Sequence, residues 1–214
     1  MYHGVLDPQP GRFAFALFNN DRKVFETGKL MRARDAADLP DFIEKRLAEA
    51  GLKLSDIQTW TVGAGPGSFT FLRLIAALVA GWQFSSNNIK FRCVPGAVAL
   101  AAALKPAEKE TVGVLYDGRN KELLYFGVIV ENGKIKPSGE TAILDAGKAV
   151  EFFKKRQNER LVSFESEKDA VEKILPPECR LSPALPDLYA LAASDAPFDN
   201  DPDNLVYIRP AVTG

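Results

Sequence analysis

Histidine and cysteine are scarce in this chain, whose 214 residues include one histidine, His3, and two cysteines, Cys93 and Cys179. A Ser-His-Asp or Cys-His catalytic arrangement would have to recruit His3, which lies near a terminus where chains fray. No histidine or cysteine spacing typical of a zinc site is present. We therefore expect no metal site and no catalytic residues, and two free thiols of the kind found in a reducing compartment.

An excess of charge and a long apolar run are also missing. The 27 basic and 28 acidic residues give a net charge of −1, so no overall field attracts nucleic acid or anionic lipid. The apolar stretch at 72–79 is too short to cross a bilayer, and the first residues lack the pattern of a signal peptide. With 46% hydrophobic residues, the composition is that of an ordinary globular protein, which we expect to be cytoplasmic.

The most informative segment is GAGPGSFTFLR, residues 63–73, between a predicted strand at 57–62 and a predicted helix at 68–84. Its turn residues are Gly63, Gly65, Pro66, Gly67, Ser68, Phe69 and Thr70. The glycines permit positive φ, and Ser68 is placed as an N-cap. A helix N-terminus held this tightly attracts anions, but the pattern taken alone is more typical of a plain turn that leads into a core helix. It is neither a Walker loop nor a GxGxxG turn.

The remaining pattern describes two similar halves. Strands are predicted at 11–17, 23–31, 57–62, 91–94, 111–116, 122–130, 134–141 and 161–164, and helices at 38–50, 68–84, up to 104, 146–157, 167–175 and 187–193. The charged segment 105–110 contains a proline and few apolar residues, which is typical of a boundary. The sequence thus predicts a duplicated α/β fold with lobes 1–106 and 107–214, and leaves open whether the last helix returns to the first lobe.

The turn segment resembles the signature of the TsaB (YeaZ-type) family, which belongs to the bacterial machinery for tRNA threonylcarbamoyladenosine. Three further segments are similar to family segments: Val5–Asp21 with Asp7, Leu115–Ile129 with Asp117, Arg119 and Glu122, and Leu205–Pro210. The resemblance therefore runs from end to end, although the matching motifs cover a minority of the residues.

This resemblance implies an actin-like, ribonuclease-H-like fold and a non-catalytic scaffold in the synthesis of N6-threonylcarbamoyladenosine (t6A) at tRNA position 37. The implied partner is a catalytic TsaD-like homologue, a second copy of the chain, or both. The balanced charge indicates that tRNA is contacted only indirectly. The catalytic relative uses a His-x-x-x-His metal pair that this chain lacks, and the family's old label as an M22-type glycoprotease has no histidine to support it.

Two other functions stay open: a small ATP-dependent kinase or hydrolase of the same fold, and a homodimeric paralogue that has left the pathway. In the superfamily, acids such as Asp7 and Asp117, with the turn at Gly118, lie at the nucleotide site. Here Pro8-Gln9-Pro10 replaces a turn rich in hydroxyl groups and removes two backbone donors. Farther along, Phe164 and Glu165 would crowd a bound base. We therefore expect no cofactor, with ATP and Mg²⁺ bound weakly or not at all.

The helix at 68–84 is apolar on most of its circumference, which is typical of a helix buried in its own core or against another subunit. The family resemblance favours a partner. The expected interface residues are Phe42, Phe71, Leu72, Arg73, Leu74, Ile75 and Leu78. Phe71 stands where the family has a small residue, so the packing geometry or the partner differs. Of the two helical rows that begin at Phe71 and Leu72, one must face the sheet and the other is available to a partner.

Overall fold

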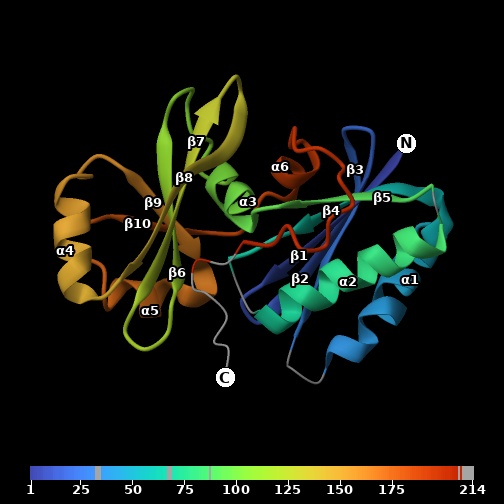
Figure 1. Cartoon of the computed structure of the whole chain (residues 1–214), viewed down its shortest axis with the longest axis horizontal. Coiled ribbons are helices and arrows are strands. Elements are labelled where there is room, and N and C mark those ends of the chain that lie inside the picture. The colour runs from blue at the N-terminus through green and yellow to red at the C-terminus, as the bar shows by residue number, and fades with distance from the viewer. Residues whose placement is uncertain (32–34, 67–68, 87, 207, 209–214) are drawn as a thin grey trace. The chain divides into compact units, whose positions relative to one another are not determined.

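The structure of the protein is a computed structural model that describes all residues except 32–34, 67–68, 87, 207 and 209–214 (Figure 1). The chain forms two compact units. The first unit combines Met1–Pro95 with the later segment Leu191–Val206, and the second contains Gly96–Ala190. The first unit is therefore built from two separate parts of the sequence.

The first unit contains a five-stranded sheet in the order β3-β2-β1-β4-β5 (Figure 1). The strands are β1 (Tyr2–Gln9), β2 (Arg12–Asn19), β3 (Arg22–Leu30), β4 (Ile57–Gly63) and β5 (Lys90–Val94). The first three are antiparallel neighbours, and β4 and β5 continue the sheet parallel to β1. Helices α1 (Leu39–Glu49) and α2 (Phe69–Ser85) contribute to one core cluster with the side chains of this sheet.

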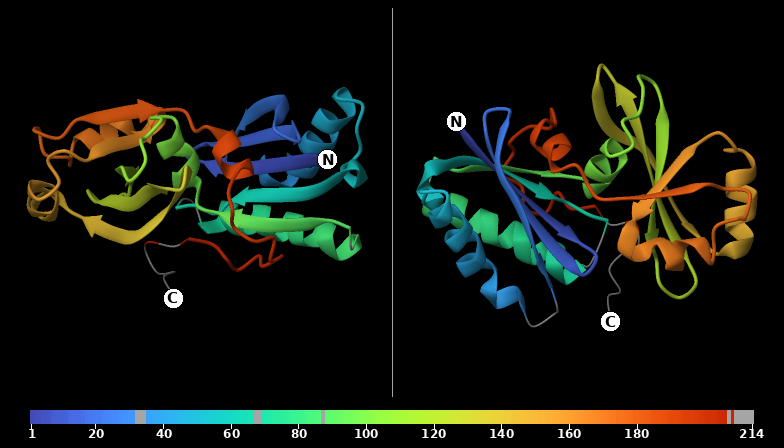
Figure 2. Two further views of the ribbon diagram at one scale, coloured as in Figure 1. Left: turned by 90° about the horizontal axis from the view of Figure 1, so that it is seen from above. Right: turned by 180° about the vertical axis from the view of Figure 1, so that it is seen from behind.

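The second unit repeats this plan, with a sheet in the order β10-β9-β6-β7-β8 (Figure 2). Its strands are β6 (Thr111–Asp117), β7 (Leu123–Glu131), β8 (Lys134–Leu144), β9 (Arg160–Phe164) and β10 (Leu181–Ala184). Its helices are α3 (Gly96–Ala102), α4 (Ala146–Lys154) and α5 (Lys168–Glu172), and α6 (Leu188–Ala192) spans the division between the units. Both sheets thus have an antiparallel meander whose first strand pairs in parallel with the fourth. The predicted duplicated α/β fold is confirmed.

The predicted elements agree with the structure except at the boundary and at two strands, β1 and β10, which were not among the predicted strands. β10 was not predicted because Pro183 interrupts its apolar pattern, and a proline is tolerated there because the strand lies at the sheet edge. The compact units divide after Pro95 rather than at residue 106, since α3 contacts the strands of the second sheet. The segment 105–110 is a turn within the second unit, where Glu110 pairs with Arg160. Among the described residues, none of the helices is long and apolar enough to cross a membrane.

The core of the first unit is centred on Trp60, whose ring is completely buried on β4. The ring lies against Gly4 of the neighbouring β1 and packs on Phe15 and Trp82, with ring centroids 6.0 Å and 4.8 Å away. A Cβ at residue 4 would overlap this ring. The core therefore requires glycine at this position.

Gly4→Ala should lower the free energy of unfolding by about 1–3 kcal/mol, because the added methyl group displaces Trp60. Gly81→Ala is the matched control, since a Cβ there meets no atom within 4 Å and alanine favours the helix α2 by about 0.5–1 kcal/mol. Denaturant unfolding followed by tryptophan fluorescence measures both variants. Equal effects of the two substitutions would contradict this view of the core.

Candidate functional site

The predicted turn follows β4 and leads into α2. Ala64, Gly65 and Pro66 are buried, and Gly65 has a φ of +94°, a conformation that side chains rarely adopt. Gly67 and Ser68 lie outside the described residues, as does the side chain of Phe69, so the N-cap at Ser68 stays a prediction. Thr70 is exposed on the first turn of the helix.

Helix α2 divides the expected interface residues into two groups. Leu72 and Ile75 have no exposed surface and belong to the core with Ala76 and Val79. Their assignment to the partner surface was therefore wrong: the row that begins at Leu72 is the one that faces the sheet. Phe71, Leu74 and Leu78, in the other row, are half-buried at the margin of the core, and Arg73 is exposed.

Phe42 and Phe71 connect α1 with α2. Both rings meet the buried ring of Phe13 edge-on, at centroid distances of 6.1 Å and 6.2 Å. Phe71 thus packs at the margin of the core of the first unit and is partly exposed.

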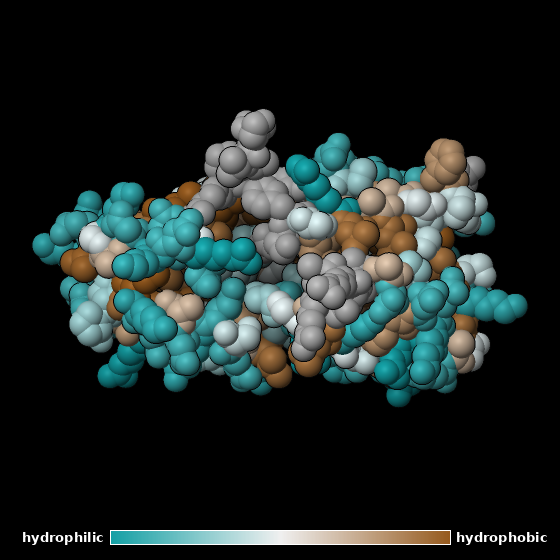
Figure 3. Space-filling view, turned by 90° about the horizontal axis from the view of Figure 1, so that it is seen from below, coloured by the Kyte–Doolittle hydropathy of each residue, from teal (hydrophilic) through white to brown (hydrophobic). Residues whose placement is uncertain are grey.

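The two helices differ in what they expose. α1 presents charged residues, among them Asp41, Glu44 and Lys45, as a solvated helix does. α2 has 17 residues, of which Arg73 alone is charged. We call the outward side of this helix the α2 face; its residues are Thr70, Phe71, Arg73, Leu74, Ala77, Leu78, Gly81 and Phe84. Figure 3 shows hydrophobic atoms gathered in this region, and 89% of Phe84 is exposed. Such a face is suited to contact with another protein.

Asp7 lies on β1 with 3% of its surface exposed. Gln9 Nε2 donates to its Oδ2 at 2.9 Å, and the carboxylate rests against Gly63, where a Cβ would overlap Oδ1. Burial raises the pKa of Asp7 to about 6, although the hydrogen bond from Gln9 acts in the opposite direction. The carboxyl group is enclosed by the unit and is not presented to a ligand.

Asp117 and Gly118 form a closed turn at the end of β6. Arg119 N donates to Asp117 Oδ1 at 2.8 Å, Gly118 N to the Glu122 carbonyl at 2.9 Å, and Glu122 N to the Arg119 carbonyl at 2.9 Å. The residues at 119–121 all have positive φ, which keeps this turn tight. The N–H groups of Gly118, Arg119 and Glu122, which could otherwise donate to a phosphate, thus donate within the turn.

Glu167 is a partly buried acid beside this turn. Its Oε2 accepts a long hydrogen bond of 3.4 Å from Asp117 N. Burial, together with the negative charge of Asp117, raises the pKa of Glu167 to about 7. We expected Phe164 to crowd a bound base. Its buried ring instead packs on Tyr116, with the ring centroids 5.9 Å apart.

A site for phosphate and Mg²⁺ needs free amides and a carboxylate open to the ion. Of the two turns, the carboxylate of Asp7 is buried, and three amides around Asp117 donate within their own turn. Across the described part of the chain, no three histidine, cysteine, aspartate or glutamate side chains lie together in a way suited to a metal ion.

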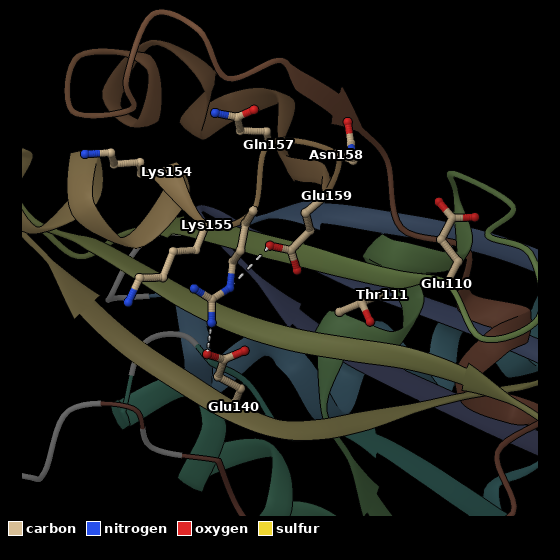
Figure 4. A pocket seen from close by; sticks show the side chains of 9 residues that line it. Glu110, Thr111, Glu140, Lys154, Lys155, Gln157, Asn158 and Glu159 are labelled. Carbon is tan, nitrogen blue, oxygen red and sulfur yellow. Dashed lines mark hydrogen bonds and ion pairs between the residues drawn. The ribbon is translucent and has the colours of Figure 1, made fainter.

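A polar hollow of about 620 Å³ lies in the second unit beside the end of α4 (Figure 4). Arg156 lies within it, bonded to Glu140 and stacked on Phe152 at 3.8 Å. The Tyr125 hydroxyl donates to Glu159 Oε1 at 2.6 Å, and burial raises the pKa of both groups. Within this hollow Arg156 pairs with Glu140 and Glu159, and none of the predicted site residues lies here.

Arg92 is the residue that our reading of the sequence missed. It is a charged residue inside the apolar strand β5, with 4% of its surface exposed. Its guanidinium binds backbone carbonyls of the segment Leu191–Val206, the second part of the first unit. The sequence does contain a signal for this residue: an arginine stands within a predicted strand whose neighbouring residues are apolar.

The chain is similar to known proteins in sequence and in fold. A protein-family model described as TsaD, tRNA N6-adenosine threonylcarbamoyltransferase, matches residues 32–179. The tRNA threonylcarbamoyladenosine biosynthesis protein TsaB of Haemophilus influenzae is 28% identical over 128 residues, or 59% of this chain and 53% of the relative. The chain thus spans about half the length of this curated relative.

Two solved structures from Pseudomonas aeruginosa have the same fold. One, described as an uncharacterized protein with similarity to peptidase YeaZ, has a TM-score of 0.73 at 21% identity and covers 97% of this chain and 99% of that one. The other, YeaZ, has a TM-score of 0.67 at 22% identity, with 89% and 90% covered.

The duplicated sheets and these structures define a two-lobed, actin-like protein. The chain belongs to the family that the TsaD model describes, as a TsaB (YeaZ-type) member. The segment Leu205–Pro210 is the C-terminal one that resembles the family. Its residues Leu205 and Val206 pack against the core of the first unit, whereas Tyr207, Arg209 and Pro210 lie outside the described residues.

Asp7→Asn should stabilise the protein at pH 7–8 and have little effect below about pH 4. The native pKa of about 6 exceeds the ordinary value of 3.8, so wild-type stability is lost as the pH rises from about 4 through 6. The difference has an upper limit of about 3 kcal/mol, at 1.36 kcal/mol per pKa unit. Denaturant unfolding across this pH range measures it, with Asp41→Asn as an exposed control. A pH-independent difference would contradict the burial of an ionised Asp7.

Proposed function

We propose that this protein is a non-catalytic scaffold in t6A synthesis that binds and stabilises a catalytic TsaD-like partner. The observation that carries the proposal is the combination of a partly exposed α2 face, in which Arg73 is the one charged residue, with turns at Asp7 and Asp117 whose polar groups are bonded internally. The protein's described residues offer a surface to another protein and form no site for phosphoryl transfer. The printed names of the family model and of the curated relative support the pathway.

The α2 face favours a protein partner over solvent for a physical reason. Leu74 and Leu78 are half-buried, so each retains apolar surface that association would remove from water. Ala77 and Gly81 lie on the outward side and allow close approach of another backbone. Phe84, at the end of α2, offers a large ring of the type that anchors interfaces. A second copy of the chain would use the same face, and the homodimer is the competing partner.

The enzymatic alternative requires a site that the described residues do not build. A kinase or hydrolase of this fold would need Asp7 or Asp117 to reach a metal-bound phosphate. Asp7 is enclosed by Gln9 and Gly63, and Asp117 accepts the amide of its own turn. We therefore place the chemistry on the partner.

In a host that lacks the gene, t6A in bulk tRNA should fall and be restored by the wild-type protein. Ala77→Glu should fail to restore it, because a charge in the centre of the α2 face opposes association while an exposed alanine makes no core contact. Ala146→Glu, the same change at an exposed position on α4, should restore it fully. Mass spectrometry of tRNA nucleosides measures the level. Unchanged t6A in the deletion strain would contradict the proposed pathway.

Calorimetric titration of the purified protein with ATP and Mg²⁺ should show no binding at millimolar ligand. This limit corresponds to a binding free energy weaker than about −4 kcal/mol. Binding in the micromolar range that is abolished by Asp117→Ala would instead support the kinase or hydrolase.

A further inference from the structure

Arg92 has an unusual set of acceptors for a buried arginine. Its Nη1 donates to the carbonyls of Ser194 at 2.7 Å and Ala196 at 2.8 Å, and its Nη2 donates to Ala192 at 2.7 Å. Its Nε donates to Thr61 Oγ1 at 2.9 Å. The guanidinium thus binds backbone carbonyls of one segment and follows the path of its backbone, and the negative charge of Asp195 in the same segment favours the charged arginine.

We call the residues Leu191–Val206 the strap; their red trace can be followed in Figure 2. Beyond Ala196, the ring of Phe198 lies 4.4 Å from the Arg92 guanidinium and its edge meets His3 at 5.9 Å. A desolvated cation on an aromatic face is a favourable contact. The first half of the strap is therefore fixed by one side chain of β5.

The second half of the strap continues along the edge of the sheet. Asn200 makes two hydrogen bonds with the backbone of Phe91 on β5. Its side-chain Oδ1 accepts from Phe91 N at 2.7 Å, and its backbone N donates to the Phe91 carbonyl at 3.1 Å. Cys93 Sγ contacts the Asp201 carbonyl at 3.6 Å. The strap thus occupies hydrogen-bonding groups that an edge strand would leave open.

The strap ends on the turn that leads into α2. Val206 N donates to the Ala64 carbonyl at 2.9 Å, while Ala64 N donates to the Val94 carbonyl at 2.7 Å. Ala64 is completely buried, and Leu205 and Val206 pack against the core that includes Ile75 of α2. The backbone at Ala64, where the turn toward α2 begins, is therefore held between β5 and the strap.

We propose that Arg92 is a positioning residue for the partner surface: by fixing the strap it holds the β4–α2 turn, and so keeps the α2 face in its binding arrangement. The part of this inference that concerns the partner rests on the proposed function. Arg92 does not belong to the α2 face itself. Its loss would reduce the fraction of molecules with the competent arrangement, and the apparent affinity falls in proportion to that fraction.

The test compares Arg92→Lys with Arg160→Lys in the second unit, where Arg160 is exposed and pairs with Glu110. Lysine keeps the charge but has three donors on one atom, so it does not reach all of these carbonyls. Hydrogen exchange with mass spectrometry should show at least 10-fold faster exchange at Asn200, Val206 and Ala64 in Arg92→Lys. Circular dichroism should stay that of the wild type.

In the same preparations, affinity for the purified TsaD-like partner should fall at least 10-fold for Arg92→Lys and stay unchanged for Arg160→Lys. If Arg92→Lys does not fold, Asn200→Ala, which removes the side-chain acceptor of Phe91 N, provides the same two readouts with a smaller perturbation. Unchanged protection at Asn200 and Val206 would overturn the role of Arg92 in holding the strap.

Faster strap exchange with unchanged partner affinity would overturn the coupling between the strap and the α2 face. A wild-type protein that does not bind the partner would overturn the proposed function and the coupling together. In that case the exchange data would still decide whether Arg92 holds the strap.

Discussion

The hydrogen bonds of the buried Arg92 guanidinium join the two parts of the sequence that make up the first unit. The donors stand on β5, whereas the carbonyls belong to residues about a hundred positions later in the chain. A buried guanidinium without these acceptors would be strongly unfavourable, so the first unit, though not its sheet, is complete only when the chain has returned after the second unit. The discontinuity of the first unit thus has a specific chemical basis.

This arrangement explains why local sequence patterns predicted most elements and missed the boundary. The glycine turn at 63–67 and the apolar rows around it are local signals, and they located β4 and α2 to within one or two residues. The charged segment 105–110 also resembled a boundary, yet α3, which precedes it, packs on the second sheet. Which unit a helix joins depends on contacts distant in sequence, and these have no local pattern.

The candidate site shows the same limit at the level of single residues. An apolar helix does not reveal which of its rows faces the sheet, so Leu72 and Ile75 were assigned to the surface although they are buried. Phe164 was similarly placed at a turn surface, but it packs on Tyr116. The lack of backbone donors at residues 8 and 10 was readable from the sequence, because a proline stands on either side of Gln9. That the amides around Asp117 are used within their own turn required coordinates.

The two lobes preserve a fold whose relatives use it for different purposes, and function has to be argued from the surfaces that each chain retains. In this chain those surfaces are the turns at Asp7 and Asp117, whose polar groups bond internally, and the nearly uncharged α2 face. Reconstitution with purified components tests this account most directly: t6A is measured in tRNA incubated with threonylcarbamoyl donor, with this protein, with the TsaD-like partner, or with both. We predict that this protein alone forms no t6A and that it increases formation by the partner. Formation of t6A by this protein alone, or no effect on its partner, would contradict the account.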